Sequence, residues 1–279
     1  MEALERRVAI DAARAAGDLL RRELRGSRHI AYKGSPTNLV TEMDARAEAL
    51  ILDTLGRAFP DDAVLTEETG SRSGRSGRRW IIDPLDGTTN YAHGVPIFAV
   101  SIALEVAGGV VLGVVYDPSQ QELFVAERGQ GAWLGDQRLR VSTAEVLDES
   151  LLVTGFPYNI RETPDTNLAE WAAFSVRVRA VRRLGSAVLD LAWLAAGRLE
   201  GYWELRVGPW DVAAGSLLVE EAGGRISDLT GGPLDLAAPA IVASNGRIHE
   251  AMLTVLRENR GWRDGEEAGP LPPVGMGRA

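Results

Sequence analysis

The sequence predicts an α+β fold, and three observations support this prediction. Apolar residues at three- and four-residue spacings predict amphipathic helices from about residue 4 to Gly26 and from Thr41 to Phe59. Short β-rich runs separated by turn sequences follow between residues 80 and 127, which is typical of an antiparallel meander. After Ser150, expected strands and helices alternate. The length of 279 residues allows one large layered domain or two halves that share a core.

Each expected element rests on a local pattern. The apolar face of the first helix consists of Leu4, Val8, Ala12, Ala15 and Leu19. The second helix has Thr41 as its expected N-cap. The meander strands are expected in the runs WIID, FAVSIALEV, VVLGVVYD and ELFVAE. Farther along, we expect strands in LLVTGF, VRVRAVRRL, EGYWEL and AIVAS, and helices at residues 167–175, 187–196, 211–222 and 249–258.

This order of elements predicts two halves and a tail. Residues 1–145 form an N-terminal α+β half with the meander, and residues 146–260 form a C-terminal α/β half. Residues 261–279 are rich in Gly, Pro and charge, so we expect a disordered tail. The run SRSGRSGR at residues 71–78 is expected to be a solvated loop. The alternative is an active-site flap, because the run lies between two acidic motifs.

Composition and charge exclude several classes of function. The net charge of −9 argues against an extended nucleic-acid interface, because such an interface neutralises phosphates with Lys and Arg. The absence of cysteine excludes disulfides, thiolate zinc sites and a cysteine nucleophile. Acidic residues interrupt the apolar pattern of residues 1–20, which argues against a signal peptide or membrane span and predicts a cytoplasmic protein. Because thiolate ligands are absent, any bound metal ion is expected to be a hard one with oxygen ligands.

The segment WIIDPLDGTTN at residues 80–90 carries most of the chemical signal. A buried strand is expected to end at Asp83, because Pro84 cannot continue the hydrogen-bond ladder, and a turn follows at Asp86. The two carboxylates and the Leu85 carbonyl offer three hard oxygen ligands within four residues. Oxygen ligands favour magnesium over zinc. The alternative interpretation is that the dipeptides DP and DG only form turns.

A phosphate site is expected directly after these ligands. Gly87, Thr88 and Thr89 can open a helix or turn whose free N–H groups and hydroxyls face the same pocket. Helix N-termini hold phosphate in this way. Metal ligands and a phosphate site would therefore adjoin.

Three further acids each have a structural alternative. Glu67 ends a short apolar run and is alternatively a solvated strand end. Asp211 stands at the expected start of a helix and is alternatively its N-cap. Asp44 lies in the first turn of the second helix, where an acid also compensates the helix dipole. The small residues at 213–215 indicate close packing of the helix that begins at Asp211 against another backbone.

Taken in this order, the four stretches resemble the inositol monophosphatase family, part of the magnesium-dependent, lithium-sensitive phosphatases that include fructose-1,6-bisphosphatases. WIIDPLDGTTN and WDVAAG followed by EAGG are specific together, and the resemblance extends from Lys33 to about Gly224. It implies a layered α-β-α-β-α sandwich of the sugar-phosphatase type and a homodimer. Two departures are Thr66, where the family commonly has Gly, and Asn38, where it commonly has Asp. Neither position is an implied ligand.

The resemblance also implies roles for individual residues. The implied Mg²⁺ ligands are Glu67, Asp83, the Leu85 carbonyl, Asp86 and Asp211. Asp44 and Thr88 would orient and deprotonate the attacking water, while Glu67 and Asp83 hold the metal that activates it. The implied substrate-binding residues are Asp86, Gly87, Thr88, Thr89, Gly185, Ser186, Ala187, Glu204 and Asp211. Of these, Glu204 would accept hydrogen bonds from polyol hydroxyls, with an ordinary exposed strand residue as the alternative.

The expected function is therefore hydrolysis of a small phosphorylated polyol by metal-activated water, with inositol 1-phosphate as the leading candidate. Fructose 1,6-bisphosphate, histidinol phosphate, and nucleotides such as adenosine bisphosphate or NADP are alternatives within the same superfamily. An alternative of another class is a phosphatase-like regulatory protein that binds transcription or ribosome-assembly machinery. No direct nucleic-acid or membrane partner is expected.

Overall fold

A computed structural model describes residues 3–26, 30–32, 39–237 and 240–260. The expectations for Lys33, Asn38 and the tail at 261–279 lie outside these residues. The helices are α1 (Ala3–Glu23), α2 (Glu42–Ala58), α3 (Thr88–Ala92), α4 (Leu168–Ser175), α5 (Ala187–Ala195), α6 (Pro209–Glu221), α7 (His249–Arg260) and the short 3₁₀ helix η1 (Leu147–Glu149). The strands are β1 (Ile30–Tyr32), β2 (Leu39–Thr41), β3 (Ala63–Thr66), β4 (Gly70–Arg72), β5 (Arg78–Asp86), β6 (Ala99–Val106), β7 (Gly109–Asp117), β8 (Glu122–Glu127), β9 (Gly131–Leu134), β10 (Gln137–Arg138), β11 (Leu151–Thr154), β12 (Ala180–Arg182), β13 (Gly201–Glu204), β14 (Arg225–Ser227) and β15 (Ile241–Ser244).

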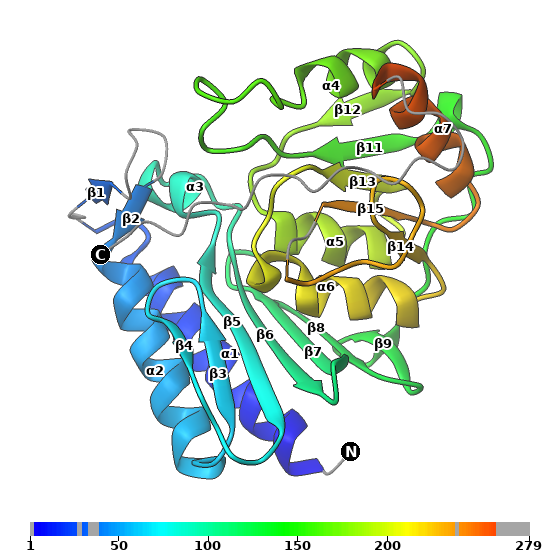
Figure 1. The fold of residues 1–279 in the computed structure, drawn as a ribbon. Helices are drawn as coiled ribbons and strands as arrows, with labels where there is room; N and C mark the ends of the chain where they lie inside the picture. Colours follow the sequence, from blue (N-terminus) through cyan, green and yellow to red (C-terminus); the bar gives the residue numbers. More distant parts are fainter. Residues whose placement is uncertain (1–2, 27–29, 33–38, 238–239, 261–279) are drawn as a thin grey trace.

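These elements form five layers (Figure 1). Helices α1 and α2 cover one face of an eight-stranded sheet, and α5 and α6 cover its other face. A five-stranded sheet lies on the far side of α5 and α6, and α4 and α7 form the outermost layer. This arrangement confirms the expected layered α-β-α-β-α sandwich. No helix in the described part of the chain is long and apolar enough to span a membrane.

The eight-stranded sheet contains the predicted meander. Its strand order is β10-β9-β8-β7-β6-β5-β3-β4, and β5 to β10 pair antiparallel with their neighbours. Strand β3 instead pairs in parallel with β5. Because β3 and β5 run in the same direction, the residues that follow them emerge at the same edge of the sheet. That edge is where the candidate site lies.

The smaller sheet is mixed, with the order β12-β11-β13-β15-β14. Strands β11 and β13 are parallel, and Thr154 pairs with Trp203 at their C-terminal ends. The hydrophobic core between the two sheets combines residues of both halves, including Ile81 and Val115 on one side and Leu189 and Leu217 on the other. This core cluster therefore contains residues from both 1–145 and 146–260.

Helix α6 packs very closely against the large sheet, as the small residues at 213–215 predicted. A Cβ atom added to Gly113 of β7 would lie 2.7 Å from the carbonyl oxygen of Ala214. A Cβ atom added to Gly215 would lie on the other side of the helix, 2.6 Å from Cβ of Leu191 in α5. Glycine and alanine are therefore required where this helix is pressed between β7 and α5.

Three local predictions were wrong in detail. Strand β5 does not end at Asp83: the ladder is irregular around Pro84, which has no N–H to donate, and pairing resumes at Asp86. Helix α6 begins two residues earlier than predicted, at Pro209, because proline is favoured in a first helical turn. The run VRVRAVRRL forms only the short strand β12, because its first residues close the end of α4.

The SRSGRSGR run begins in β4, and the exposed residues 73–77 that follow form a loop. Arg75 donates its backbone N–H to Asp61 O at 2.7 Å and forms an ion pair with the same aspartate. This contact places the loop where β5 begins, at Arg78, whereas Asp83 lies toward the other end of that strand. The structure therefore supports the solvated loop and not the active-site flap.

Candidate active site

Acidic side chains converge at the edge where β3 and β5 end. Thr66 pairs with Ile82 across these two parallel strands, so the next residues, Glu67 and Asp83, lie beside each other. The negative charge of Glu67 raises the pKa of Asp83, in addition to the larger effect of burial, which agrees with their proximity. Asp86 follows at the end of β5. The sequence pattern LTEE and the motif WIIDPLDGTTN thus meet through strand pairing.

Asp83, Asp86 and Asp211 form a tight carboxylate cluster. Each offers an oxygen atom, and these oxygens all lie within 4.8 Å of one another. Asp211 comes from α6 in the middle layer, whereas the other two come from β5 in the large sheet. The structure thus brings together segments that are far apart in the sequence. Glu67 lies outside this group of three but close enough to act electrostatically on it.

Hydrogen bonds hold each of these carboxylates in place but use only some of its acceptor sites. Asp83 Oδ1 accepts the Leu85 N–H at 3.0 Å. Asp86 Oδ2 accepts the Ser186 hydroxyl and the Val188 N–H, and so fixes the start of α5. Asp211 Oδ2 accepts the Gly208 N–H at the start of α6. The helix-capping interpretation of Asp211 is therefore partly correct, although the N-cap residue is Gly208 and Asp211 occupies the third helical position.

Burial and mutual repulsion disfavour the charged forms of these acids. Burial raises the pKa of Asp83 well above its usual range, and the charges of Glu67, Asp86 and Asp211 raise it further. Burial raises the pKa of Asp86 to about 6, despite the hydrogen bonds from Ser186 and Val188. Burial, followed by the charges of Asp86 and Glu67, also raises the pKa of Asp211. A bound cation would relieve this repulsion.

The donor set fits a hard divalent cation. Asp83 is 1% exposed, and its Oδ2 atom has no hydrogen-bond partner in the described structure. A buried carboxylate oxygen without a partner is costly unless an ion or other ligand satisfies it. The neighbouring groups are carboxylates and a backbone carbonyl, which are the ligands that Mg²⁺ prefers. Asp83, Asp86 and Asp211 can therefore hold a metal ion, with Glu67 and the Leu85 carbonyl beside them.

Asp44 and Thr88 are in direct contact. The Thr88 hydroxyl lies 3.0 Å from Asp44 Oδ1 and also 3.0 Å from the Leu85 carbonyl oxygen. The second carboxylate oxygen of Asp44 accepts the N–H and the hydroxyl of Thr41, at 2.8 and 2.7 Å. Asp44 thus caps α2 with one oxygen and contacts Thr88 with the other. This geometry is compatible with both the structural and the functional interpretation of the residue.

Two glycines allow the backbone to turn around this cluster. Gly87 has a φ of 89°, and a Cβ atom there would lie 2.8 Å from the Ile97 carbonyl oxygen. Gly185 has a φ of 87° and lies against Asn90. The Asn90 side-chain amide donates to the carbonyl oxygens of Ile97 and Leu184, at 2.9 and 2.8 Å. Asn90, the last residue of the motif, therefore ties the Gly87 turn to the Gly185 turn, a role that the sequence did not indicate.

The remaining predicted residues lie around these turns. Ser186 is buried and caps α5, Ala187 is its first residue, and Thr89 follows Thr88 in α3. Glu204 ends β13 in the small sheet and accepts the Tyr202 hydroxyl at 2.8 Å. Burial raises the pKa of Glu204 to about 7, against the lowering effect of that hydrogen bond.

Two residues near the cluster were missed. Asp190 of α5 is buried, and its Oδ1 has no hydrogen-bond partner in the described structure; burial and the charges of Glu204 and Asp86 raise its pKa. The Tyr158 pKa is also raised, first by burial of its hydroxyl and then by charges that include Glu67 and Asp211, although 51% of the residue is exposed. Neither residue belongs to a recognisable motif. Only the tertiary structure places them beside the acids.

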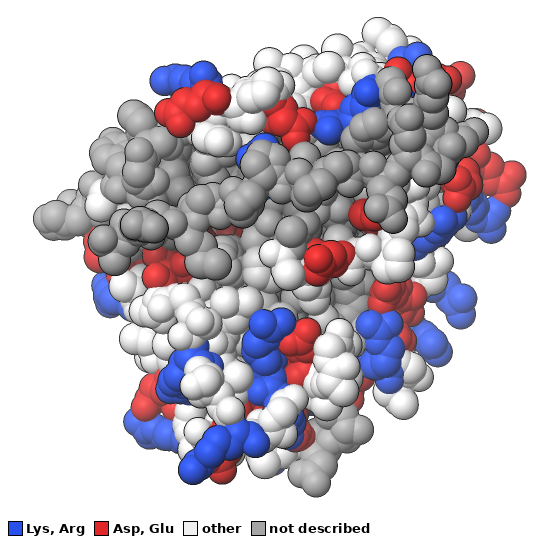
Figure 2. All heavy atoms as spheres, in the orientation of Figure 1, with Lys and Arg blue, Asp and Glu red and all other residues white. Residues whose placement is uncertain are grey.

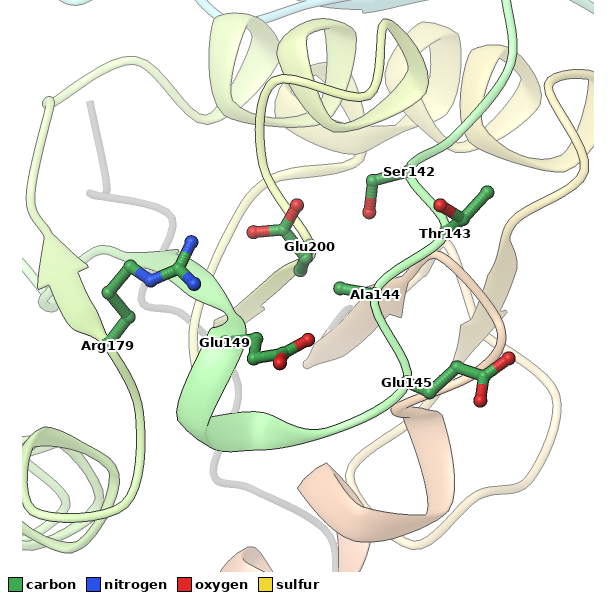
Figure 3. Close-up of a pocket in the computed structure, with 7 residues that line it drawn as sticks. All are labelled: Ser142, Thr143, Ala144, Glu145, Glu149, Arg179 and Glu200. Carbon is green, nitrogen blue, oxygen red and sulfur yellow. The ribbon is translucent and has the colours of Figure 1, made fainter.

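A separate polar pocket lies elsewhere in the small-sheet half (Figure 3). Its volume is about 520 Å³, and it is lined by Ser142, Thr143, Ala144, Glu145, Glu149, Arg179 and Glu200. Glu200 precedes β13 and accepts the N–H of Leu151, the first residue of β11. The pocket thus lies at the start of these parallel strands, whereas Glu204 lies at their end. It is distinct from the carboxylate cluster.

Charged side chains of both signs lie on the surface of the described residues (Figure 2). On the face shown in Figure 2, the Lys and Arg side chains of the described residues are interspersed with Asp and Glu. Ion pairs among the described residues include those of Arg198 with Glu122 and of Arg128 with Glu220.

Comparisons with known proteins point to one family over nearly the whole chain. Residues 3–260 match the model of the inositol monophosphatase family. The chain is 45% identical over 254 residues to the Nus factor SuhB of Escherichia coli (strain K12). This alignment covers 90% of this chain and 95% of that protein. It is 46% identical over 234 residues to the inositol-1-monophosphatase of Synechocystis sp.. This alignment covers 84% of this chain and 82% of that protein. The solved structure of the inositol monophosphatase from Anabaena (Nostoc) sp. has a TM-score of 0.82 at 44% identity, over 90% of this chain and 94% of that one.

Proposed function

The chain belongs to the inositol monophosphatase family, and on that premise we propose that it is a magnesium-dependent phosphomonoesterase acting on a small phosphorylated polyol. Inositol 1-phosphate is the leading candidate. The observation that carries this proposal is the buried cluster of Asp83, Asp86 and Asp211, with Asp83 Oδ2 lacking a hydrogen-bond partner in the described structure. A bound cation would neutralise such a cluster, and the family is a phosphatase family.

We assign the metal ligands to two overlapping groups. Asp83, Asp86 and Asp211 form one, and Glu67, Asp83 and the Leu85 carbonyl form the other. Bound there, Mg²⁺ ions lower the pKa of a water molecule and neutralise charge that develops on the phosphoryl and leaving groups. The contribution of the chain is to hold the carboxylates in place through one oxygen each, as Leu85 N–H does for Asp83. Little side-chain motion is then required when the ions bind.

Thr88 and Asp44 are proposed to act on the attacking water. When the Thr88 hydroxyl donates to Asp44 Oδ1, its oxygen atom can accept a hydrogen bond from water. The proton lost by the water then moves to the Thr88–Asp44 pair. Asp44 keeps its orientation throughout, because Thr41 holds its other oxygen with two hydrogen bonds. This pair is the proposed general base.

The substrate is proposed to lie where β5 of the large sheet and β13 of the small sheet end, at Asp86 and Glu204. The backbone N–H groups of the Gly87–Thr89 turn would bind the phosphate group, and the Gly185–Ala187 turn and Glu204 would contact the hydroxyls of the polyol. Glu204 is well suited to this role because a carboxylate accepts several hydrogen bonds and Tyr202 already fixes one of its oxygens. Fructose 1,6-bisphosphate, histidinol phosphate and nucleotides remain alternative substrates.

The test is release of phosphate from a panel of substrates, with Mg²⁺ and with EDTA. The panel contains inositol 1-phosphate, fructose 1,6-bisphosphate, histidinol phosphate, glycerol 2-phosphate, adenosine bisphosphate and NADP. We expect Mg²⁺-dependent release with the highest kcat/KM for inositol 1-phosphate, and inhibition by lithium at saturating Mg²⁺. Equal release in EDTA would contradict the metal assignment, and preference for another substrate would replace the polyol assignment.

A second candidate function is regulatory binding to transcription machinery. It is favoured by the name of the E. coli relative, Nus factor SuhB, which is as similar to this chain as the inositol-1-monophosphatase of Synechocystis. The intact carboxylate cluster indicates that such a role would be additional to catalysis. Loss of binding to purified transcription factors in a surface variant that retains full phosphatase activity would establish it as separate.

We further propose a homodimer in the cytoplasm. Apolar side chains are exposed on and beside α4: Leu168 is 50% exposed, Trp171 is 41% exposed and Val176 is 83% exposed. A large exposed apolar patch often marks a protein interface. Light scattering should then give a mass twice the 30.0 kDa of the chain. A mass of one chain at micromolar concentration would contradict the dimer.

A further inference from the structure

Gly155 lies where the side chain of Glu204 needs space. Thr154 pairs with Trp203 at the ends of the parallel strands β11 and β13. Gly155 follows Thr154 and Glu204 follows Trp203, so these two residues are neighbours. A Cβ atom on Gly155 would lie 2.1 Å from Glu204 Oε1 and 2.2 Å from Oε2. Atoms cannot approach so closely. The carboxylate therefore occupies the volume that any other residue at position 155 would fill.

The glycine is required for space and not for backbone conformation. The φ of Gly155 lies outside the left-handed region, in contrast to those of Gly87 and Gly185. An alanine could therefore adopt the same backbone conformation without strain. Its methyl group would displace the Glu204 carboxylate instead. This makes Gly155→Ala a selective change in the position of one side chain.

A buried network holds the Gly155 backbone in place. The Asn167 side-chain amide donates to the Gly155 carbonyl oxygen at 2.6 Å and to the Thr154 hydroxyl oxygen at 2.8 Å. Its own carbonyl oxygen accepts the Trp203 indole N–H at 2.7 Å. Asn167 is 1% exposed, and its φ of 64° lies in the left-handed region that asparagine tolerates. The two strand ends that carry Gly155 and Glu204 are thus fixed relative to each other.

Tyr202 also fixes the position of the Glu204 carboxylate. Its hydroxyl donates to Glu204 Oε2 at 2.8 Å, and the residue is fully buried. Glu204 is therefore confined between this hydroxyl and the bare backbone of Gly155. A carboxylate confined in this way presents its acceptor sites in fixed directions, which favours ligands whose hydroxyl groups match those directions.

We propose that Gly155 is a specificity-determining position: by leaving room for the Glu204 carboxylate, with Asn167 fixing its backbone, it sets the preference of the enzyme for phosphate esters of polyols over esters without hydroxyl groups. This inference rests on the proposed function of the site. Gly155, Asn167 and Tyr202 are positioning residues that act through Glu204. The phosphoryl-transfer residues around Asp83 are not part of this arrangement.

The test compares two substrates that share the phosphate and differ in the alcohol. Inositol 1-phosphate carries ring hydroxyls, and 4-nitrophenyl phosphate carries none. We expect Gly155→Ala to raise KM for inositol 1-phosphate by about tenfold, because the hydrogen bonds to the Glu204 carboxyl group are misplaced. KM and kcat for 4-nitrophenyl phosphate should change by less than about twofold. Tyr202→Phe, which removes only the hydroxyl, should shift the two substrates in the same unequal way.

A double-mutant cycle separates this effect from general damage to the fold. In Glu204→Ala the carboxylate that the added methyl group would meet is gone, so adding Gly155→Ala should leave KM for inositol 1-phosphate unchanged. Gly56→Ala is the matched control, because a Cβ atom at Gly56 meets nothing within 4 Å. This control variant should change KM and kcat for neither substrate.

The outcomes distinguish this inference from the proposed function. If the wild type releases no phosphate from inositol 1-phosphate, the proposed function fails and the inference with it. If the wild type hydrolyses both substrates but Gly155→Ala affects them equally, or acts as strongly in the Glu204→Ala background, the inference alone is overturned. Unequal effects that vanish in that background would support it.

Discussion

The Thr88 hydroxyl lies 3.0 Å from Asp44 Oδ1, which joins the start of α3 to the first turn of α2 across 44 residues of sequence. This contact links two motifs that look independent in the sequence. Because Asp44 is buried and its other oxygen accepts hydrogen bonds from Thr41, its carboxylate is held in a fixed orientation beside Thr88. A fixed pair of this kind suits proton removal from a water molecule held beside it.

The first prediction concerns this pair. Thr88→Val keeps the shape of the side chain but removes the hydroxyl, so the proton path to Asp44 is interrupted. We expect kcat for inositol 1-phosphate at saturating Mg²⁺ to fall by about 10²- to 10⁴-fold, the usual contribution of general base catalysis. Thr88→Ser should retain most of the activity. A Thr88→Val variant with kcat close to that of the wild type would exclude the role.

The second prediction concerns pH and metal binding. Asp86 has a pKa of about 6 in the folded protein, above the ordinary value of 3.8. Between these pH values the folded protein holds a proton that the unfolded chain has released, so the contribution of Asp86 to stability without metal is lost as pH rises from about 4 to 6. Mg²⁺ offsets the repulsion between ionised carboxylates. It should therefore raise the melting temperature more at about pH 8 than at about pH 5.

Calorimetry with and without Mg²⁺, at matched ionic strength, measures this difference. An equal increase of the melting temperature at both pH values would indicate that the ion binds outside the carboxylate cluster. Asp211→Asn should reduce the increase at the higher pH.

The third prediction tests the packing of α6. Gly113→Ala places a methyl group 2.7 Å from the Ala214 carbonyl oxygen, so α6 must move away from β7. We expect the free energy of unfolding to fall by about 1–3 kcal/mol, as overpacking of a core usually does. Gly56→Ala in α2, where the added atom meets nothing within 4 Å, should instead be neutral or stabilising. Denaturant unfolding of both variants provides the comparison.

The fourth prediction concerns His249, which is fully buried between the hydroxyls of Ser227 and Ser244. Burial lowers the pKa of His249 from 6.5 to about 4. The unfolded chain binds a proton in this range that the folded protein does not, so the stability contributed by His249 is present above pH 6.5 and is lost as pH falls toward 4. The full shift corresponds to about 3 kcal/mol.

His249→Gln isolates this contribution. The difference in free energy of unfolding between wild type and variant should shrink as pH falls from about 7 to about 4. Only the wild type has a histidine here, and the proton that it binds in the unfolded chain favours unfolding. A difference that stays constant over that range would contradict the assignment of His249 as a buried neutral side chain.

Local patterns were sufficient to predict most elements. Amphipathic spacing predicted α1 and α2, and Thr41 is the N-cap of α2 as expected. The β-rich runs predicted β5 to β8 because turn residues separate them. The exception, VRVRAVRRL, alternates like a strand, but Val176 is 83% exposed at the end of α4. Alternation alone does not show whether the apolar face has a surface to pack against.

The acids of the site were predictable because they occur in dense motifs. Their supporting residues were not. Gly155 and Asn167 matter only because β11 and β13 are neighbours in the small sheet, and no spacing in the sequence indicates that pairing. Asn90 likewise acts through the Leu184 carbonyl, 94 residues away. Contacts between distant segments arise from the tertiary structure, so their roles became visible only there.

The most direct test of the proposed function is the Mg²⁺-dependent kcat/KM of Asp83→Asn for inositol 1-phosphate. Asp83 lies in both proposed ligand groups, and the change removes its charge while preserving its shape. The exposed Asp136 provides the matched control, as Asp136→Asn. We expect a loss of at least about 10³-fold in Asp83→Asn, with the fold retained and Asp136→Asn unaffected. Activity close to that of the wild type would show that the carboxylate cluster is not the catalytic metal site.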